Sequence, residues 1–230
     1  MSEMQITGIV VTYNTRSLIE RAYTSLRKFH PFMPLIIIDG SSPADPCYKY
    51  VYSLRSEYNQ VYHSGKIGHG RGMDYALKKC GTKQALVFDS DIEILQDPLP
   101  EMQKLMTPEI YGTGWVYEIG RDGYDYGTPG FNHKEPIPYM HPYFMLLNVE
   151  QYFNFHRFVH HGAPCYKAMV DLFDKGQSWR VVPCPILTGH TSSEGMNWKG
   201  KPNAYVRHDF GGTRMNNKKQ GKEEIEGTWE

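Results

Sequence analysis

The sequence predicts an α/β fold in which helices cover both faces of a mostly parallel central sheet. Short apolar runs, such as residues 35–38 and 85–88, lack the alternation of a half-exposed strand and are typical of strands buried on both faces. Segments with the apolar spacing of amphipathic helices separate these runs. Strands that alternate with helices in this way favour right-handed crossovers and a parallel sheet.

The first half of the chain carries this alternation most clearly. We expect strands at residues 5–13, 35–39, 61–63 and 85–88, and helices at residues 16–29, 47–58 and 73–79. Thr15 or Ser17 can cap the first helix, and Pro31 and Pro34 end it. A glycine-rich loop, residues 65–72, is expected to lead into the third helix.

The pattern is weaker beyond Asp91. We expect strands at residues 111–119, 143–147 and 180–182, a short apolar segment at 186–187 and a helix at 163–173. Residues 120–138 are rich in glycine, proline and polar residues, and a loop of this length is usually functional or mobile. Residues 215–230 are expected to form a flexible tail. We therefore expect a single domain over residues 1–230.

The composition is that of a globular protein. The 230 residues are 40% hydrophobic and 22% charged, and a formal net charge of +0 gives no general basic surface for nucleic acid or membrane. No apolar run approaches the roughly 18 residues of a membrane span, and no secretion signal opens the sequence. We therefore expect a soluble, cytoplasmic protein.

The cysteines do not form a zinc-binding pattern. Cys47, Cys80, Cys165 and Cys184 lie far apart, without a CxxC pair or a histidine at the spacing of a zinc finger. We expect them to be free thiols in a reducing compartment.

Polar side chains follow three of the expected strands. Asp89 and Asp91 come at the end of the fourth strand, where two carboxylates at i and i+2 point the same way and can approach one divalent cation. Residues 12–14 lie at the end of the first strand and Asp39 closes the second. Because parallel strands end at one edge of their sheet, we expect these groups to share a cleft. A solvated turn is the alternative for the acidic pair.

Four motifs follow one another in the first half: VVTYN at residues 10–14, IIIDGSS at 36–42, GHGRGMDYAL at 68–77 and LVFDSDIEI at 86–94. In this order they resemble the nucleotide-sugar half of GT-A glycosyltransferases, most closely the family 2-like group. The resemblance covers residues 5–95, and the joint order is far more specific than any single motif.

The resemblance implies a GT-A fold, which is a Rossmann-like, three-layer fold of nucleotide-diphospho-sugar transferases with a mostly parallel central sheet. It also implies a metal-dependent glycosyltransferase that moves a hexosyl or pentosyl group from a UDP- or GDP-sugar to an acceptor. Residues 1–95 would then be the nucleotide-sugar-binding half and residues 96–214 the acceptor half of the domain. A glycan, a protein and a modified nucleobase all stay open as acceptors.

The resemblance also assigns roles to single residues. The base pocket would involve residues 12–14, and Asp39 would bind the base or the ribose. Asp91 would hold Mn²⁺ or Mg²⁺, Asp89 would meet the ribose or the metal, and His190 would be a further metal ligand. His208, which is followed by two glycines and an arginine, is the alternative to His190. The complete donor-binding set expected on this basis is Thr12, Tyr13, Asn14, Asp39, Gly68, Arg71, Asp89 and Ser90.

The catalytic base is not where the resemblance would place it. Inverting members carry a Glu-Asp pair at the positions of Ala168 and Met169. An inverting reaction needs a carboxylate to accept the proton of the acceptor, and the candidates are Asp171, Asp174 and Glu194. Inversion with a displaced base and retention therefore both stay open.

Aromatic residues of the second half are candidates for binding the acceptor. Trp115, Tyr117, His141 and Tyr143 could stack on a sugar or a nucleobase, or could belong to the core. Two other functions also stay open: a nucleotidyltransferase that makes sugar nucleotides, and a catalytically silent binding module. The first would need a glycine-rich loop directly after the first strand, where VVTYNTRS stands instead.

Overall fold

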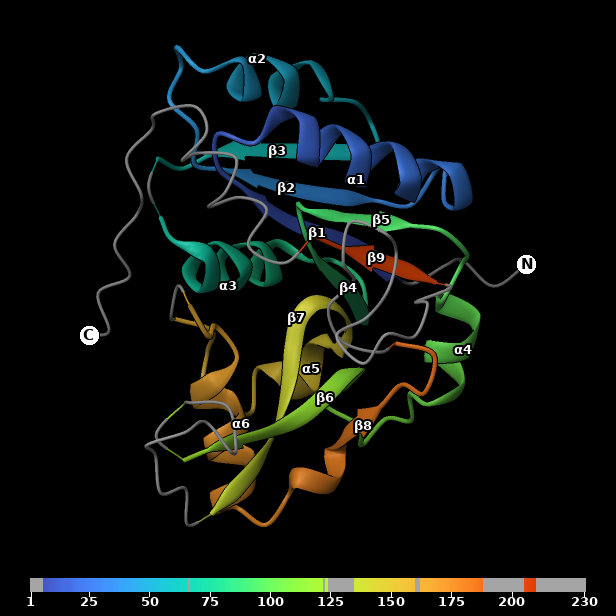
Figure 1. Ribbon diagram of the computed structural model, residues 1–230, viewed down its shortest axis with the longest axis vertical. Coiled ribbons are helices and arrows are strands. Elements are labelled where there is room, and N and C mark those ends of the chain that lie inside the picture. The colour runs from blue at the N-terminus through green and yellow to red at the C-terminus, as the bar shows by residue number, and fades with distance from the viewer. Residues whose placement is uncertain are drawn as a thin grey trace.

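The computed structural model describes residues 6–65, 67–121, 123, 135–159, 162–187 and 205–209. Its main sheet has seven strands in the order β3-β2-β1-β4-β7-β6-β8 (Figure 1). All of them except β7 run in one direction. The α/β class with a mostly parallel sheet is therefore confirmed. The strands are β1 Ile6–Thr12, β2 Leu35–Asp39, β3 Asn59–His63, β4 Gln84–Asp89, β6 Gly112–Gly120, β7 Pro136–Asn148 and β8 Val181–Pro183.

Helices lie on both faces of this sheet (Figure 1). Alternate residues of β2 point to opposite faces, so that Ile37 packs in the core under α1 and α2, and Ile36 and Ile38 pack in the core under α3 and α6. Each fully buried side chain of this size contributes about 1.5–3 kcal/mol. The helices are α1 Arg16–Phe29, α2 Pro46–Ser53, α3 His69–Lys79, α4 Leu99–Lys104, α5 Val149–Tyr152 and α6 Tyr166–Asp174, with the 3₁₀ turn η1 Ser178–Arg180.

A second sheet was not predicted from the sequence. The short strands β5, Ile92–Ile94, and β9, Val206–His208, pair in antiparallel orientation (Figure 1). Three-residue strands carry too little periodicity to be recognised in a sequence. This pairing joins two segments that lie more than a hundred positions apart in the chain.

Several predicted boundaries were wrong. Helix α3 begins at His69 instead of residue 73, so the predicted glycine-rich loop is shorter. Glycine serves here for close packing, because a Cβ on Gly72 would lie 3.0 Å from Cγ1 of Val11 in β1. Helix α2 ends at Ser53 and not at residue 58, and β7 already begins at Pro136, within the predicted loop 120–138.

Strand β7 contains a wide irregularity at Pro142. Gly114 of β6 pairs with Met145 and Val116 pairs with Met140, so that residues 141–144 stand opposite Trp115 alone. Proline has no N–H to donate to a ladder and is accommodated at such bulges. Bulges bend a strand and redirect its side chains, and they are common beside active sites.

Gly112 allows β6 and β7 to pack closely, and its replacement tests this account of the sheet. A Cβ there would lie 2.8 Å from Cδ2 of Leu147 and 2.9 Å from the carbonyl oxygen of Leu146, which cannot move independently. We predict that Gly112→Ala lowers the free energy of unfolding by about 1–3 kcal/mol. Gly81→Ala is the control, because a Cβ on Gly81 meets no atom within 4 Å. Equal melting temperatures for the two variants would contradict the account.

Candidate active site

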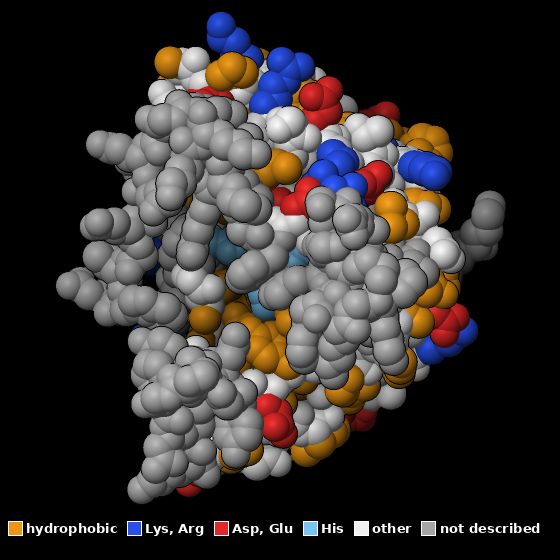
Figure 2. All heavy atoms as spheres, viewed as in Figure 1, with side chains coloured by type: hydrophobic (Ala, Val, Ile, Leu, Met, Phe, Trp, Pro, Cys, Tyr) orange, Lys and Arg blue, Asp and Glu red, His pale blue; other side chains and the backbone are white. Residues whose placement is uncertain are grey.

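The ends of four parallel strands meet at one edge of the sheet. Thr12 at the end of β1 pairs in register with Asp39 of β2, and Asp39 pairs with His63 of β3. On the other side of β1, Val11 pairs with Asp89 of β4. Figure 2 shows histidine side chains near the centre of the face on which Figure 1 is viewed. The structure therefore brings the predicted groups of the first, second and fourth strands to a common edge.

Asp89, Asp91 and His208 form a compact cluster. One ligand atom from each lies within 4.8 Å of the other two. Nε2 of His208 is 3.3 Å from Oδ1 of Asp91 and 3.6 Å from Oδ2 of Asp89. The exposed fractions of the side chains are 2% for His208, 8% for Asp91 and 15% for Asp89. Of the two histidines considered from the sequence, His208 joins the acidic pair, and His190 lies outside the described residues.

The β5–β9 pairing holds His208 in this position. His208 stands opposite Ile92, next to Asp91, and the backbone N–H of Asp209 donates to the carbonyl oxygen of Asp91 over 3.0 Å. Arg21 of α1 reinforces the contact. Its Nη2 lies 2.6 Å from Oδ2 of Asp209 and donates to the carbonyl oxygen of Asp91 over 3.3 Å. Arg21 therefore links helix α1 to the residues that directly precede β5 and directly follow β9.

The electrostatics of the cluster favour a positive charge between the two carboxylates. Burial alone would raise the pKa of Asp89, but the charges of His69, His208 and His141 lower it to about 2. Burial alone would lower the pKa of His208, whereas the hydrogen bond and the charge of Asp91, and the charge of Asp89, raise it above its usual value.

The ligand atoms of this cluster suit a divalent cation. Carboxylate oxygens with one imidazole nitrogen suit Mn²⁺, and carboxylate oxygens suit Mg²⁺. Oδ1 of Asp89 forms an ion pair with Nε2 of His69 at 3.1 Å, whereas Oδ2 faces Nε2 of His208. Asp89, Asp91 and His208 could therefore hold Mn²⁺ or Mg²⁺.

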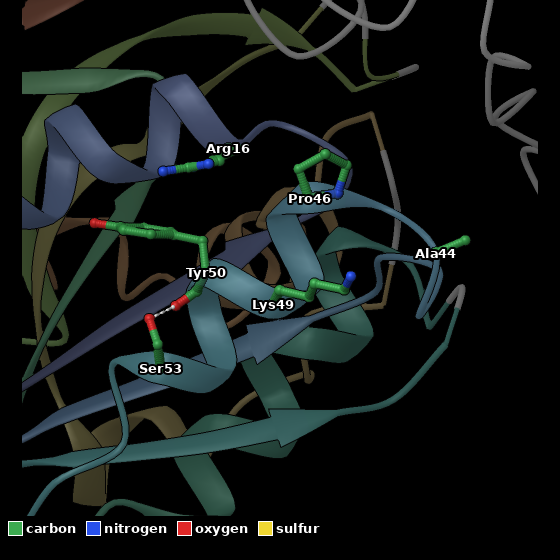
Figure 3. Close-up of a pocket in the computed structure, with 6 residues that line it drawn as sticks. All are labelled: Arg16, Ala44, Pro46, Lys49, Tyr50 and Ser53. Carbon is green, nitrogen blue, oxygen red and sulfur yellow. Dashed lines mark hydrogen bonds between the residues drawn. The ribbon is translucent and has the colours of Figure 1, made fainter.

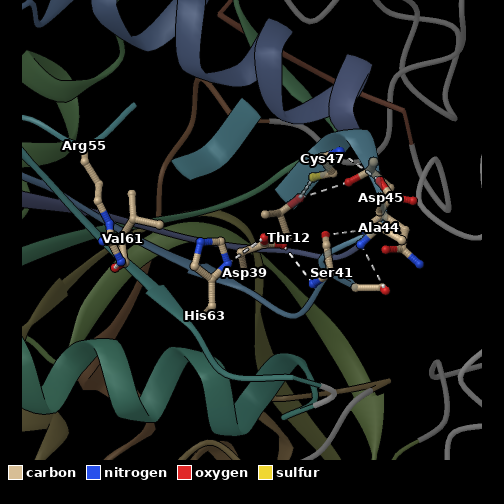
Figure 4. A network of polar contacts seen from close by, with 12 residues as sticks. Thr12, Asp39, Ser41, Ala44, Asp45, Cys47, Arg55, Val61 and His63 are labelled. Atoms are coloured by element: carbon tan, nitrogen blue, oxygen red, sulfur yellow. Dashed lines mark hydrogen bonds and ion pairs between the residues drawn. The ribbon is translucent and has the colours of Figure 1, made fainter. Parts of the chain in front are cut away.

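Residues expected to bind a nucleotide form a polar network at the end of β1 and β2 (Figure 4). The N–H of Ser41 donates to Oδ1 of Asp39 over 2.9 Å, and the N–H of Asn14 donates to Oγ of Ser41 over 2.8 Å. Oγ1 of Thr12 lies 3.0 Å from that of Thr15. Tyr13 packs against the adjacent turn, since a Cβ on Gly40 would lie 3.3 Å from its ring. Asp39 is thereby fixed by Ser41 of the loop that follows β2, and Asn14 of the loop that follows β1 holds Ser41 in turn.

The start of α3 borders the cluster. Gly68 is its N-cap, with φ of 81°, a backbone conformation that glycine adopts without strain. His69 follows and pairs with Asp89, while Arg71 is exposed one residue beyond Gly70. Sequence reasoning missed His69, although it stands inside the quoted motif GHGRG. Ser90, also expected at this edge, is buried between Asp89 and Asp91.

Aromatic side chains of β6 and β7 continue from the cluster. The ring of Tyr143 stacks on His208 with 4.8 Å between centroids and 12° between planes. His141 lies 5.8 Å from His208 and 5.3 Å from Trp115, which stacks on Tyr117 at 4.6 Å. The four residues expected to bind an acceptor are thus in mutual contact and reach the candidate metal ligands.

The two candidates for the catalytic base that the structure describes, Asp171 and Asp174, both lie on α6. Asp171 of α6 accepts the N–H of His156 over 3.0 Å and pairs with Lys175, while Asp174 pairs with Arg121 at 2.8 Å. Neither belongs to the cluster of Asp89. Glu194 lies outside the described residues. All three assignments stay predictions. Ala168 and Met169, at the positions of the missing Glu-Asp pair, are buried in the core, with 0% and 1% of their surface exposed.

A separate pocket of about 430 Å³ lies between the first turn of α1 and helix α2 (Figure 3). The guanidinium of Arg16 stands 5.4 Å from the centre of the Tyr50 ring. None of the residues of the Asp89 cluster lines this pocket, whereas Ala44, which belongs to the polar network of Figure 4, does. The lining residues are Arg16, Ala44, Pro46, Lys49, Tyr50 and Ser53.

Other expectations from the sequence can be compared with the described residues. All four cysteines are free thiols, as predicted. Among the described helices, none combines the length and the apolar character that crossing a membrane requires.

Comparisons with known proteins show which family and which solved structures this chain is similar to. The family model described as "Glycosyl transferase family 2" matches residues 7–173. No curated protein matches the chain. Among solved structures, the chain is similar to "Mannosyltransferase PcManGT from Pyrobaculum calidifontis in complex with GDP-Man and Mn2+", with a TM-score of 0.51 and 17% identity over 70% of this chain and 50% of that one.

Two further structures have the same general fold. GalNAc-T7 with UDP, GalNAc and Mn²⁺ gives a TM-score of 0.58 at 11% identity, over 78% of this chain and 42% of that one. Glucosyl-3-phosphoglycerate synthase from Mycobacterium tuberculosis gives 0.54 at 15% identity, over 77% and 68%. The chain spans about half the length of the mannosyltransferase. The family match over residues 7–173, together with this fold, shows that the chain belongs to glycosyl transferase family 2 and has the GT-A fold.

Proposed function

We propose that this chain transfers a sugar from a nucleoside-diphosphate sugar to an acceptor and that it requires Mn²⁺ or Mg²⁺. The observation that carries the proposal is the cluster of Asp89, Asp91 and His208, whose ligand atoms lie within 4.8 Å of one another at the carboxyl edge of the sheet. Similar structures that contain GDP-Man or UDP together with Mn²⁺ support the same donor class.

The cluster has a defined task in such a reaction. Negative charge builds on the departing diphosphate, and a divalent cation would stabilise it as a Lewis acid. Asp89, Asp91 and His208 would hold that cation. The N-terminal turn of α3, with Gly68 and the exposed Arg71, presents backbone N–H groups and a guanidinium to the diphosphate. These groups offset the repulsion between the two carboxylates and the negatively charged diphosphate.

The nucleoside would lie beside the polar network of β1 and β2. Thr12, Asn14 and Asp39 lie beside one another there, and Tyr13 offers an aromatic face. Ser90 stands between the two acidic residues, next to the ribose and the diphosphate in this proposal. The donor therefore extends along the edge of the sheet from β2 to β4.

The acceptor would bind on the aromatic side chains of β6 and β7. Trp115, Tyr117 and His141 are partly exposed, whereas Tyr143 is buried against His208. The bulge at Pro142 turns His141 and Tyr143 toward the metal ligands, so an acceptor stacked there lies next to the transferred sugar. Stacking favours acceptors with a flat face, such as a glycan or a modified nucleobase, and a protein side chain is the third possibility.

We propose that the catalytic base is one of three carboxylates, Asp171, Asp174 or Glu194. The first two are held by Lys175 and Arg121 and would have to exchange these partners to reach an acceptor. A general base contributes about 10²- to 10⁴-fold to the rate, so a loss of that size in kcat on replacement by the amide identifies it. Retention would leave all three variants active.

The direct test is a thermal-shift screen of sugar nucleotides with and without Mn²⁺. A donor at 100 times its Kd stabilises the folded state by about 2.7 kcal/mol, which raises the melting temperature of a chain of this length by roughly 5–10 °C. We expect this shift only when metal and donor are both present, with slow hydrolysis of the same donor. A panel without any metal-dependent shift would contradict the proposal.

Asp91→Ala tests the metal site. We predict that it abolishes both sugar transfer and donor hydrolysis and raises the Kd for Mn²⁺ at least about 100-fold, because one of three ligands is lost. Glu101→Gln is the control, since Glu101 is an exposed partner of Lys104 on α4. Titration calorimetry measures the Kd, and circular dichroism verifies the fold. Full activity of Asp91→Ala would refute the assignment.

Arg21→Met tests the link between α1 and the cluster. Arg21 contacts the backbone carbonyl of Asp91 and the carboxylate of Asp209, neither of which is a candidate ligand group. Loss of such outer contacts weakens metal binding about 10- to 100-fold, and we predict this range for Mn²⁺ without nucleotide. Arg16→Met on the same helix is the control, because Arg16 pairs with Glu20 at the surface, at 3.8 Å, and stands over the ring of Tyr50. An unchanged Kd in folded Arg21→Met would contradict the role.

A further inference from the structure

His69 is not one of the three candidate metal ligands, but it contacts one of them. Its Nε2 lies 3.1 Å from Oδ1 of Asp89. Oδ2 of Asp89 faces His208 instead, at 3.6 Å from Nε2, and the same nitrogen of His208 is 3.3 Å from Oδ1 of Asp91. The two oxygens of Asp89 therefore have different neighbours. Oδ2 faces the candidate ligands, and Oδ1 is paired with His69.

Sheet register and helix packing together fix His69 in this position. Val11 of β1 pairs in register with Asp89, so both side chains point to the face of the sheet that α3 covers. Gly72 of α3 packs on Val11, because a Cβ on Gly72 would lie 3.0 Å from Cγ1 of Val11. His69 precedes Gly72 by three positions and lies on the same side of the helix. The contact between His69 and Asp89 is thus set by elements that pack independently of it.

The pair of His69 and Asp89 is largely shielded from water. The exposed fractions of the two side chains are 21% and 15%. An imidazole nitrogen and a carboxylate oxygen attract one another more strongly in such a place than in bulk water. A rotation of Asp89 that turned both oxygens toward His208 would break this contact. His69 therefore opposes that rotation.

Divalent cations differ in the number of carboxylate oxygens that they accept. Mg²⁺ takes six ligands at about 2.1 Å in a nearly octahedral arrangement, and Mn²⁺ also suits octahedral oxygen sites. Ca²⁺ is larger, takes about six to eight oxygens and readily binds both oxygens of one carboxylate. A site in which a carboxylate offers a single oxygen therefore favours the smaller cations.

We infer that His69 determines which cation the site accepts. It holds Oδ1 of Asp89, so that Asp89 offers only Oδ2, and the site favours Mn²⁺ and Mg²⁺ over Ca²⁺. His69 is a positioning residue that acts through Asp89 and is not itself a ligand. The inference rests on the proposed function, in which Asp89, Asp91 and His208 hold a cation, and adds a residue that gives this site its selectivity.

The test measures the Kd for Mn²⁺ and the Kd for Ca²⁺ by titration calorimetry without nucleotide. We expect the wild-type chain to bind Mn²⁺ at least about 100-fold more tightly than Ca²⁺. In His69→Leu, Asp89 can turn both oxygens to the cation. We expect Mn²⁺ to bind about 10- to 100-fold more weakly and the Kd for Ca²⁺ to change less than about 3-fold.

The ratio of the two Kd values separates a selective role from a structural one. Equal weakening of Mn²⁺ and Ca²⁺ in folded His69→Leu, or no change in either Kd, would overturn the inference and leave the proposed function standing. A wild-type chain without preference between the two cations would do the same. If the wild-type chain binds neither cation, the proposed metal site fails and the inference fails with it.

His69→Gln tests whether the contact with Asp89 is the cause. The amide NH₂ of glutamine reaches about as far as Nε2 of histidine and can donate to Oδ1, so we expect the Kd ratio to return to within about 3-fold of the wild-type value. Lys79→Met is the control, since Lys79 is exposed in the last turn of the same helix and should alter neither Kd. A folded His69→Gln with the ratio of His69→Leu would contradict the inference.

A second measurement counts the water molecules on bound Mn²⁺ by their effect on proton relaxation. If both oxygens of Asp89 bind the ion in His69→Leu, the second oxygen takes the place of a water. We therefore expect about one coordinated water fewer in His69→Leu than in the wild-type chain. Equal water counts would show that Asp89 binds alike in both proteins and would contradict the role of His69.

Discussion

The hydrogen-bond register of β1 with its two neighbours is the constraint on which the site depends. It aligns Thr12 with Asp39 on one side and Val11 with Asp89 on the other. A slip by one residue would turn Asp39 and His63 to the face of α3 and Asp89 away from His69. The register is itself fixed by the cores on both faces, since each strand buries alternate apolar residues on opposite sides of the sheet. Packing far from the polar edge thus determines the chemistry at that edge.

Two local features of the main sheet shape the binding site: a close helix–strand contact and a bulge. Gly72 lets α3 approach β1, which places His69, at the start of the helix, against Asp89. The bulge at Pro142 interrupts β7, where Tyr143 stacks on His208. Both features weaken regular structure locally and are tolerated because the surrounding core is extensive. The candidate donor and acceptor sides therefore meet at the cluster of Asp89, Asp91 and His208.

The parts of the site that follow buried strands could be predicted from the sequence. Asp39, Asp89 and Asp91 stand at the ends of unbroken apolar runs. Such runs can be recognised in a sequence as buried strands, because burial requires apolar side chains. His63, His69 and Arg21 could not be found this way, because single polar residues carry no periodicity and their partners lie on other elements. His208 was one of two candidates, and the pairing of the three-residue strands β5 and β9 brings it to the acidic pair, while His190 lies outside the described residues. The glycines at the start of α3 led to the prediction of a loop, because glycine has a low helix propensity. In the structure these residues are helical, and the close packing of Gly72 against Val11 outweighs that low propensity.

The central claim is that Asp89, Asp91 and His208 hold a divalent cation that binds the diphosphate of the donor. Crystals grown with Mn²⁺ and UDP, measured at the manganese absorption edge, test it most directly. The account predicts one anomalous peak about 2.1 Å from an oxygen of Asp91, with Asp89 and His208 around it and the diphosphate completing the coordination. An anomalous map without a peak between these side chains, or nucleotide bound with its diphosphate turned away from them, would contradict it.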